Sequence, residues 1–299
     1  MSGFQRVIKY CAIALAVVLS LTIIVGCIQI VMFVANIASN GDLETATIDF
    51  SKEWSMEEAG ELKEITVSAG TEIKLESGER LSVEGSNLLD NCEATLENGV
   101  LTVSTKNNSD FSIILFDLSW HRSVLTITVP KEIDLDKIYI RSGSDRVYAE
   151  DITAKNLTLK SGSGRVHIED VTLEEFHLES GSGRVEVADS ALGETDIDSG
   201  SGRVELSNVS GKNAVIRSGS GRVEVSGTLL GNTKLHSGSG RVSLKLQGSK
   251  DDYYISVNSG SGGFYLNGKK HKDLETGVNT AGELRIVSGS GRVNLDFVN

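Results

Sequence analysis

The chain has 299 residues, a net charge of −12, 32 glycines and only 5% aromatic residues. This length suits one large domain or two modest ones. The apolar residues outside the N-terminus alternate with polar ones, which excludes an intrinsically disordered chain. The negative net charge argues against sequence-independent binding to nucleic acid or to anionic lipid.

The first predicted element is a membrane-spanning helix. Residues 10–35 contain no charged side chain, and a helix of this length spans roughly 39 Å, enough to cross a hydrocarbon core of about 30 Å with tilt. Arg6 and Lys9 precede this run, whereas the first charge after it is Asp42, so the positive-inside rule places the N-terminus in the cytoplasm. We therefore predict a cytoplasmic tail, a transmembrane signal anchor and an extracytoplasmic part at residues 1–9, 10–36 and ~39–299.

Two alternatives remain open for this segment. Residues 24–27 read IVGC, which resembles a lipoprotein box in which Cys27 becomes lipidated, but the apolar run continues to Ala35, whereas such a box normally ends it. A cleaved secretory signal has a shorter apolar region of about 7–15 residues, and residues 35–38 lack the spacing of a cleavage site. A signal anchor is favoured, and all three hypotheses place the remainder outside the cytoplasm.

The next segments predict a cap followed by irregular strands. Residues 37–64 are acidic and partly helix-compatible, so we expect a stalk with an N-terminal cap. Alternating triplets such as Ile65-Thr66-Val67 and Leu101-Thr102-Val103 predict irregular β rungs over residues 65–141. Cys92 is alone in this outer part, and we expect a small buried residue rather than a reactive thiol.

A dense apolar run, DFSIILFDLSW, interrupts these rungs at residues 110–120. Its aromatic residues are Phe111, Phe116 and Trp120. The run is either a cap or strand packed on the rungs or, alternatively, a surface that docks a partner or lies near the membrane.

The rest of the chain, residues 142–299, is built on a repeated motif, SGSGRV. Intact copies begin at Ser161, Ser180, Ser199, Ser218, Ser237 and Ser288, and the variants SGSDRV and SGSGGF begin at Ser142 and Ser259. Successive copies from Ser142 to Ser237 are 19 residues apart, and the last two intervals are 22 and 29 residues. A period near 20 with strand-like alternation is typical of a solenoid.

The apolar positions within each repeat predict a corner at the motif. Apolar residues lie four and two residues before the first serine and five and seven residues after it, as at Leu157, Leu159, Val166 and Ile168. In one uninterrupted strand, side chains an odd number of residues apart point to opposite faces, so these four apolar residues could not all point inward. The SGSG segment must therefore bend. Glycine suits a bend that needs positive φ, and serine leaves room where coils stack closely.

These observations predict the fold class. A lone coil buries too little apolar surface to fold, so the coils must stack and share backbone hydrogen bonds. We expect an all-β protein, an elongated parallel β-solenoid of ~19-residue coils preceded by the single N-terminal transmembrane helix. Eight coils would extend roughly 38 Å, with Leu295 and Phe297 closing the stack.

One arginine follows each corner and predicts a column along the stack. Glutamates two residues further on, at Glu186, Glu205 and Glu224, would neutralise its middle. The column is either a solvated face that pins the register or, alternatively, a repetitive surface for an anionic glycopolymer of the envelope. Its members are Arg146, Arg165, Arg184, Arg203, Arg222, Arg241 and, after a gap at Gly263, Arg292.

Motifs for nucleotide, metal and catalytic sites are lacking in the sequence. The glycine motif precedes a strand rather than a helix and contains no GKS or GKT, which argues against a phosphate loop. Calcium-binding rolls need repeated aspartates, and only Asp145 stands at the corner. The five histidines show no metal-ligand spacing, and no GxSxG or Cys/His pair is evident, so we expect neither a cofactor nor an enzyme.

The order of segments resembles a known bacterial family. The N-terminal apolar helix, the stretches VSAGTEIKLESGERLSVEG and LTITVPKEIDLDKIYIRSGS, and the serial SGSGRV units are similar to the DUF4097 family over roughly residues 60–299. The resemblance implies a β-strand-repeat fold at the cell envelope and the label of a candidate adhesin, with no catalytic residues to carry over. Family members commonly carry Asp after the last corner glycine, where this chain mostly has Arg.

The expected function is that of a non-enzymatic, membrane-anchored β-solenoid outside the cytoplasm, an adhesin-like or structural interaction module at the bacterial envelope. Expected partners are the membrane and an envelope glycopolymer or a membrane protein, with neither nucleic acid nor nucleotide. An alternative is an accessory sensor or regulator of envelope stress, which would need a membrane partner because the cytoplasmic tail of nine residues cannot signal alone. A third hypothesis is a carbohydrate-active β-helix enzyme.

Overall fold

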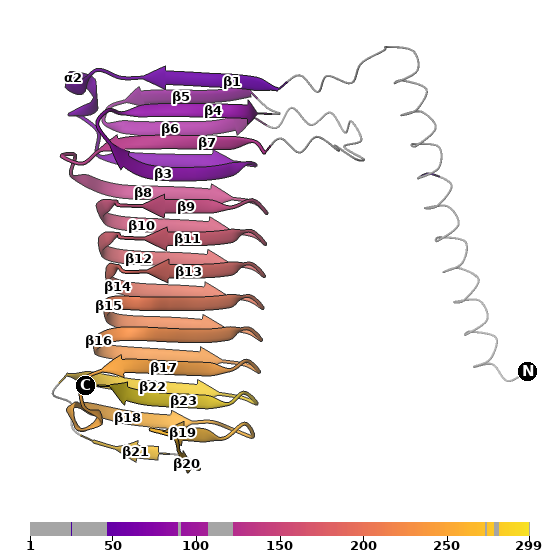
Figure 1. Ribbon diagram of the computed structural model, residues 1–299, viewed down its shortest axis with the longest axis vertical. Helices are drawn as coiled ribbons and strands as arrows, with labels where there is room; N and C mark the ends of the chain where they lie inside the picture. Colours follow the sequence, from indigo (N-terminus) through magenta and orange to yellow (C-terminus); the bar gives the residue numbers. More distant parts are fainter. Residues whose placement is uncertain are drawn as a thin grey trace, which may run out of the picture. The chain divides into compact units, whose positions relative to one another are not determined.

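The computed structural model describes an all-β chain, with strands from Ile48 to Val298. The described residues are 25, 47–88, 91–106, 122–272, 274–277 and 281–298. Strand after strand stacks into a solenoid-like repeat fold (Figure 1). Most ladder pairings are parallel, as the repeat predicted.

Each rung of the stack contains a forward strand, the Ser-Gly-Ser-Gly corner and a return strand. Four forward strands are β8 (Leu135–Ser142), β10 (Thr153–Ser161), β12 (Thr172–Ser180) and β14 (Ala191–Ser199). The matching return strands are β9 (Val147–Glu150), β11 (Arg165–Glu169) and β13 (Arg184–Ala188). Two long strands, β15 (Arg203–Ser218) and β16 (Arg222–Ser237), each combine a return strand with the forward strand of the next rung. The following strand, β17 (Val242–Gln247), is a return strand only.

The register between rungs follows the 19-residue repeat on both sides of the first corner, and it shifts by one residue only within parts of the β14–β15 and β15–β16 pairings. The forward strands pair Ser161 with Ser180, and the return strands pair Arg165 with Arg184. Parallel neighbours lie about 4.8 Å apart. The positions next to the first corner therefore form columns of equivalent side chains along the stack.

Alternation along the strands explains which columns form the core. Val204 and Leu206 of β15 are 0% and 2% exposed, whereas the alternate residues Arg203 and Glu205 face outward. The inward columns of forward and return strands share one hydrophobic core, because a rung alone would leave both open to water.

A second corner, after each return strand, uses residues that tolerate left-handed backbone. Asp151, Asp170, Asp189 and Asn208 have φ of 55°, 52°, 50° and 53° at the same repeat position, and Gly227 follows with 139°. Asp and Asn adopt this region more readily than other side chains, which explains this column.

Close backbone stacking, and not positive φ, explains the glycines of the first corner. The corner glycines of the five intact copies between Ser161 and Gly240, all of them described, have no positive φ, so that part of the sequence-based expectation is wrong. A Cβ on Gly202 would overlap the carbonyl oxygen of Gly183 in the preceding rung, and one on Gly183 would overlap that of Gly164. The last glycine of the motif is therefore a spacing requirement between rungs.

The variant SGSDRV fits this explanation. Asp145 occupies the position of the last glycine, and the rung before it pairs Ala69 with Ser142 and Ile73 with Val147. Three residues separate Ala69 from Ile73, against four between Ser142 and Val147, so the neighbouring corner is shorter. Burial, and secondarily the Glu72 carboxylate, raise the pKa of Asp145.

The C-terminal end of the stack departs from sequence order. The final pair, β22 (Gly282–Ser288) and β23 (Val293–Val298), lies between β16/β17 and the pair β18 (Tyr253–Asn258) and β19 (Phe264–Leu266). Beyond a 3-10 turn, η1 (Lys250–Asp252), the short strands β20 (Lys269–His271) and β21 (Leu274–Thr276) cover β19 and β18 in antiparallel pairs. In Figure 1 the C-terminus accordingly lies beside β17 and β22, with β18 to β21 beyond it.

Two sequence-based expectations are therefore wrong. Leu295 and Phe297 do not close the stack, because they belong to a rung covered on both sides. The arginine column has no gap at Gly263, because Val293 pairs with Val242 and Arg292 thus directly follows Arg241. The insertion between the last two motifs lets the chain turn back, so that β22 and β23 pair between β16/β17 and β18/β19.

The N-terminal end shows a similar exchange of order. The rung of β2 (Glu64–Ala69) and β3 (Glu72–Gly78) lies between β8/β9 and the pair β6 (Val100–Lys106) and β7 (Val124–Pro130). Antiparallel strands then cover this end: β4 (Ser82–Leu88), β1 (Ile48–Glu53) and β5 (Asn91–Glu97). The one-turn helix α2 (Met56–Ala59) begins with a capping box between Ser55 and Glu58.

Several predicted features lie outside the described residues. They are the membrane segment at 10–36 apart from Val25, the tail at 1–9, Cys27, and the aromatic run with Phe111, Phe116 and Trp120. Within the described part of the chain, no helix combines the length and apolar character that a membrane crossing requires.

The corner geometry predicts that Gly202→Ala destabilises the protein. Its Cβ would overlap the Gly183 carbonyl oxygen, so the rungs must separate, at a cost of about 2–4 kcal/mol in the free energy of unfolding. Ser201→Ala, one residue earlier and exposed, is the matched control and should change stability by less than about 0.5 kcal/mol. Equal urea midpoints for the two variants would contradict the spacing role of this glycine.

Candidate binding faces

Two solvent-facing columns run along the stack, one on each side of the first corner. The arginine column lies at the start of the return strands, where Arg165 pairs with Arg184 and Arg184 with Arg203. The second column ends the forward strands, where Arg141 pairs with Lys160 and Lys160 with Glu179. The parallel register makes both columns continuous.

The arginine column is partly neutralised by neighbouring carboxylates. Arg184 Nη1 lies 3.0 Å from Glu186, and Arg222 Nη1 lies 3.4 Å from Glu224. At the N-terminal end, Arg146 is 4.0 Å from Glu72. These half-exposed pairs contribute little to stability, about 0–1 kcal/mol each.

Other arginines of this column carry no such partner. Arg165, Arg203 and Arg241 form no ion pair in the part of the chain that the structure describes. The guanidinium of Arg292 lies over the ring of Tyr265, 5.2 Å from its centroid, in the next rung. The column therefore presents unneutralised cations between paired ones.

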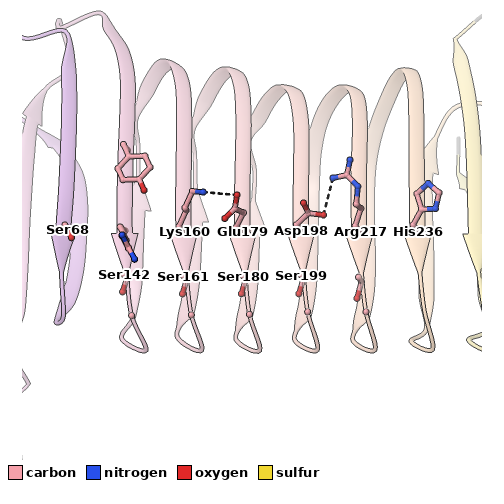
Figure 2. A pocket seen from close by; sticks show the side chains of 18 of the residues that line it. Ser68, Ser142, Lys160, Ser161, Glu179, Ser180, Asp198, Ser199, Arg217 and His236 are labelled. Carbon is pink, nitrogen blue, oxygen red and sulfur yellow. Dashed lines mark hydrogen bonds and ion pairs between the residues drawn. The ribbon is translucent and has the colours of Figure 1, made fainter.

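A polar groove follows the second column and was not predicted. It has a volume of about 1420 Å³, and the glycines that open successive corners, from Gly143 to Gly238, line it together with the forward-strand side chains. Figure 2 shows part of this wall: Lys160, Glu179 and Asp198 lie above Ser161, Ser180 and Ser199, and Arg217 and His236 follow on the next two rungs. The wall residues are Arg141, Lys160, Glu179, Asp198, Arg217 and His236.

The middle of the wall is a network of ion pairs. Lys160 Nζ donates to Glu179 Oε1 at 2.9 Å, and His177 Nε2 lies 3.0 Å from the same oxygen. The Lys160 ammonium and then His177 lower the pKa of Glu179. His177 Nδ1 lies 3.8 Å from Asp196, which extends the network to the next rung.

The network continues through one arginine. Arg217 Nη1 donates to Asp196 at 2.7 Å and to Asp198 at 3.1 Å. Asp198 first, and then Asp196, raise the pKa of Arg217. Two adjacent carboxylates, Glu179 and Asp198, thus lie between Lys160 and Arg217, and the centre of the wall largely neutralises itself.

The N-terminal end of the groove has a different character. Arg141 is exposed, pairs in register with Ser68 and Lys160, and forms no ion pair among the described residues. Tyr139 also lines the groove, two residues earlier on β8 and therefore on the same face. Thr105 lines this end too, where its hydroxyl accepts the Gly70 N–H at 3.2 Å.

The serine that opens each corner is a structural residue. Ser288 Oγ donates to the carbonyl of Gly291 at 3.2 Å across its own corner. The same hydroxyl has no partner within the described residues at six other corners and is buried there, since the serine points inward. These six residues are Ser142, Ser161, Ser180, Ser199, Ser218 and Ser237.

The described residues contain no group of three His, Cys, Asp or Glu side chains placed to hold a metal ion. Cys92 is partly buried against the core, and burial raises its pKa to about 11, so its thiol is protonated at neutral pH.

The groove could not be predicted from the constant positions of the repeat, because none of them forms its wall. Its wall is the residue immediately before each motif, which changes from Arg to Lys, Glu, Asp, Arg and His. This position could have indicated the groove. It faces outward beside a corner rich in glycine, and it holds a charged residue or His in six successive copies.

The family of the chain follows from comparison with family models. The model of Toastrack DUF4097 matches residues 62–296, which includes the whole stack from β2 to most of β23. The chain belongs to the Toastrack DUF4097 family. No curated protein matches the sequence.

Solved structures with similarity to this Toastrack protein have low sequence identity. A candidate adhesin from Bacteroides fragilis is 14% identical with a TM-score of 0.49, covering 85% of this chain and 99% of its own. A candidate adhesin from Parabacteroides distasonis is 15% identical with a TM-score of 0.48, covering 84% and 98%. A candidate lipid-binding protein from the same species is 18% identical with a TM-score of 0.46, covering 84% and 97%.

The ion-pair network predicts an acid-dependent contribution of Glu179. Because its pKa is lowered in the folded protein, its stabilising effect is present above the ordinary glutamate pKa and disappears as the pH falls through the folded value. Glu179→Gln should lower the melting temperature near pH 7, and the difference from the natural chain should vanish near about pH 3.

Glu175→Gln is the matched control, because this exposed glutamate lies on the same strand and forms no ion pair in the described part of the chain. Its effect should be small at every pH. A pH-independent loss for Glu179→Gln, measured by thermal melts across this range, would contradict the network.

Proposed function

We propose that this Toastrack protein is a non-enzymatic, adhesin-like interaction module of the bacterial cell envelope, anchored by an N-terminal membrane helix. Residues 10–36 would form the anchor, and residues ~39–299 would lie outside the cytoplasm. The uncharged run and the flanking charges Arg6, Lys9 and Asp42 support this orientation.

The observation that carries the proposal is the continuous polar groove along the stack. The groove runs past six wall residues on consecutive rungs, from Arg141 to His236, and its glycine floor has no side chains to divide it. A site of this form suits an extended partner that lies along several rungs. The arginine column offers a second repeated surface on the return strands.

The proposal favours binding over catalysis. The charged groups at the centre of the groove form ion pairs with one another, as in Lys160–Glu179 and Arg217–Asp198. A general acid or base needs a pKa near the working pH, whereas Glu179 is shifted away from neutrality. The groove thus has the character of a recognition surface.

Two measurements test the proposal. Protease added to intact cells should remove a C-terminal tag and spare an N-terminal tag, and the chain should stay with the membrane pellet after a high-salt wash. The purified full-length chain in detergent should sediment with the insoluble envelope fraction without releasing soluble sugar from it. A protected C-terminal tag would contradict the orientation, and the release of reducing ends would identify an enzyme.

A further inference from the structure

We propose that the groove binds an extended, neutral glycan that carries a carboxylate at one end, and that Arg141 and Tyr139 bind this carboxylate-bearing end. This inference rests on the proposed binding function and names its ligand class. It concerns the forward-strand face and is independent of the arginine column.

The shape of the groove fits a linear polymer. Successive wall residues are one rung apart, about 4.8 Å, so the six positions from Arg141 to His236 extend over roughly 24 Å. The glycines at the corners leave the floor open, because a larger side chain there would meet the neighbouring rung. An unbranched chain can therefore lie close to the backbone along the whole groove.

The centre of the groove suits neutral polar groups. Lys160, Glu179, Asp198 and Arg217 satisfy one another's charge, yet 40%, 45%, 45% and 47% of their side chains stay exposed. Their remaining donors and acceptors can bind hydroxyl and acetamido groups. A polymer with an anion on every unit would be repelled by Glu179 and Asp198, which argues against polyanions such as nucleic acid.

The N-terminal end of the groove suits an anionic group. Arg141 has no acidic partner among the described residues, and a guanidinium binds a carboxylate with two parallel hydrogen bonds. The ring of Tyr139 on the same face offers a flat apolar surface for a sugar ring and a hydroxyl for its polar edge. Ser68, next to Arg141 in register, adds a further hydroxyl.

The test compares two probes that differ in their carboxylates. Chitin oligosaccharides oxidised at the reducing end carry one terminal carboxylate, and the unoxidised oligosaccharides of the same length lack it. The full-length chain in detergent should bind the oxidised oligosaccharides about tenfold more tightly than the unoxidised ones, measured by calorimetry. Equal affinities, or no binding of either probe, would overturn the proposal.

Variants assign the preference to the groove. Arg141→Ala should remove the tenfold preference, Arg141→Lys should restore part of it, and Tyr139→Ala should weaken both probes severalfold. Unchanged circular dichroism and melting temperature would show that these substitutions leave the fold intact. A preference that survives Arg141→Ala would overturn the assignment.

An exposed lysine outside both columns, Lys245 on β17, provides the matched control. Lys245→Ala also removes one exposed cation and should leave both affinities unchanged. If this variant abolishes binding while Arg141→Ala does not, the groove assignment is wrong and the proposed binding function stands. If the full-length chain also fails to sediment with the envelope fraction, the proposed function fails as well.

Discussion

The structure depends on how closely the backbones of neighbouring rungs approach at the first corner. The carbonyl oxygen of one corner glycine occupies the place where a Cβ of the next would lie, as for Gly183 and Gly202. This contact fixes the distance between rungs, and the parallel hydrogen bonds fix their register. A side chain at this position would separate two rungs and break the pairing on both sides of the corner.

Strict register is what turns a repeated sequence into a binding surface. Because each rung repeats the backbone path of the last, outward positions align into columns whose chemistry can change from rung to rung without changing the fold. The forward-strand column uses this freedom, with an unpaired cation at Arg141 and ion pairs from Lys160 to Arg217. The return-strand column keeps its arginine in each rung from Arg146 to Arg292.

The periodic features could be predicted from the sequence, whereas the order of the rungs could not. The alternation of apolar and polar residues, as around Val204 and Leu206, is a local pattern, and it predicts the corner, the inward-facing residues and the parallel stack. The placing of β22 and β23 between earlier rungs depends on long-range pairing, for which no local pattern exists, so Leu295 and Phe297 were assigned wrongly to the end. The reason for glycine was also assigned wrongly, because close approach between rungs is a tertiary contact.

The register and order of the rungs can be measured directly by cross-linking in a chain whose three native cysteines are replaced by alanine. Ser243 and Asn294 pair in neighbouring rungs, and Asn294 pairs in turn with Tyr265, so Ser243 and Tyr265 lie two rungs apart. Neighbouring positions about 4.8 Å apart suit a disulfide, and positions about 9.6 Å apart do not. The structure predicts rapid oxidation of the pair Ser243→Cys with Asn294→Cys and none for Ser243→Cys with Tyr265→Cys. The opposite result, a cross-link only between the cysteines at 243 and 265, would show that the rungs stack in sequence order and would contradict this account.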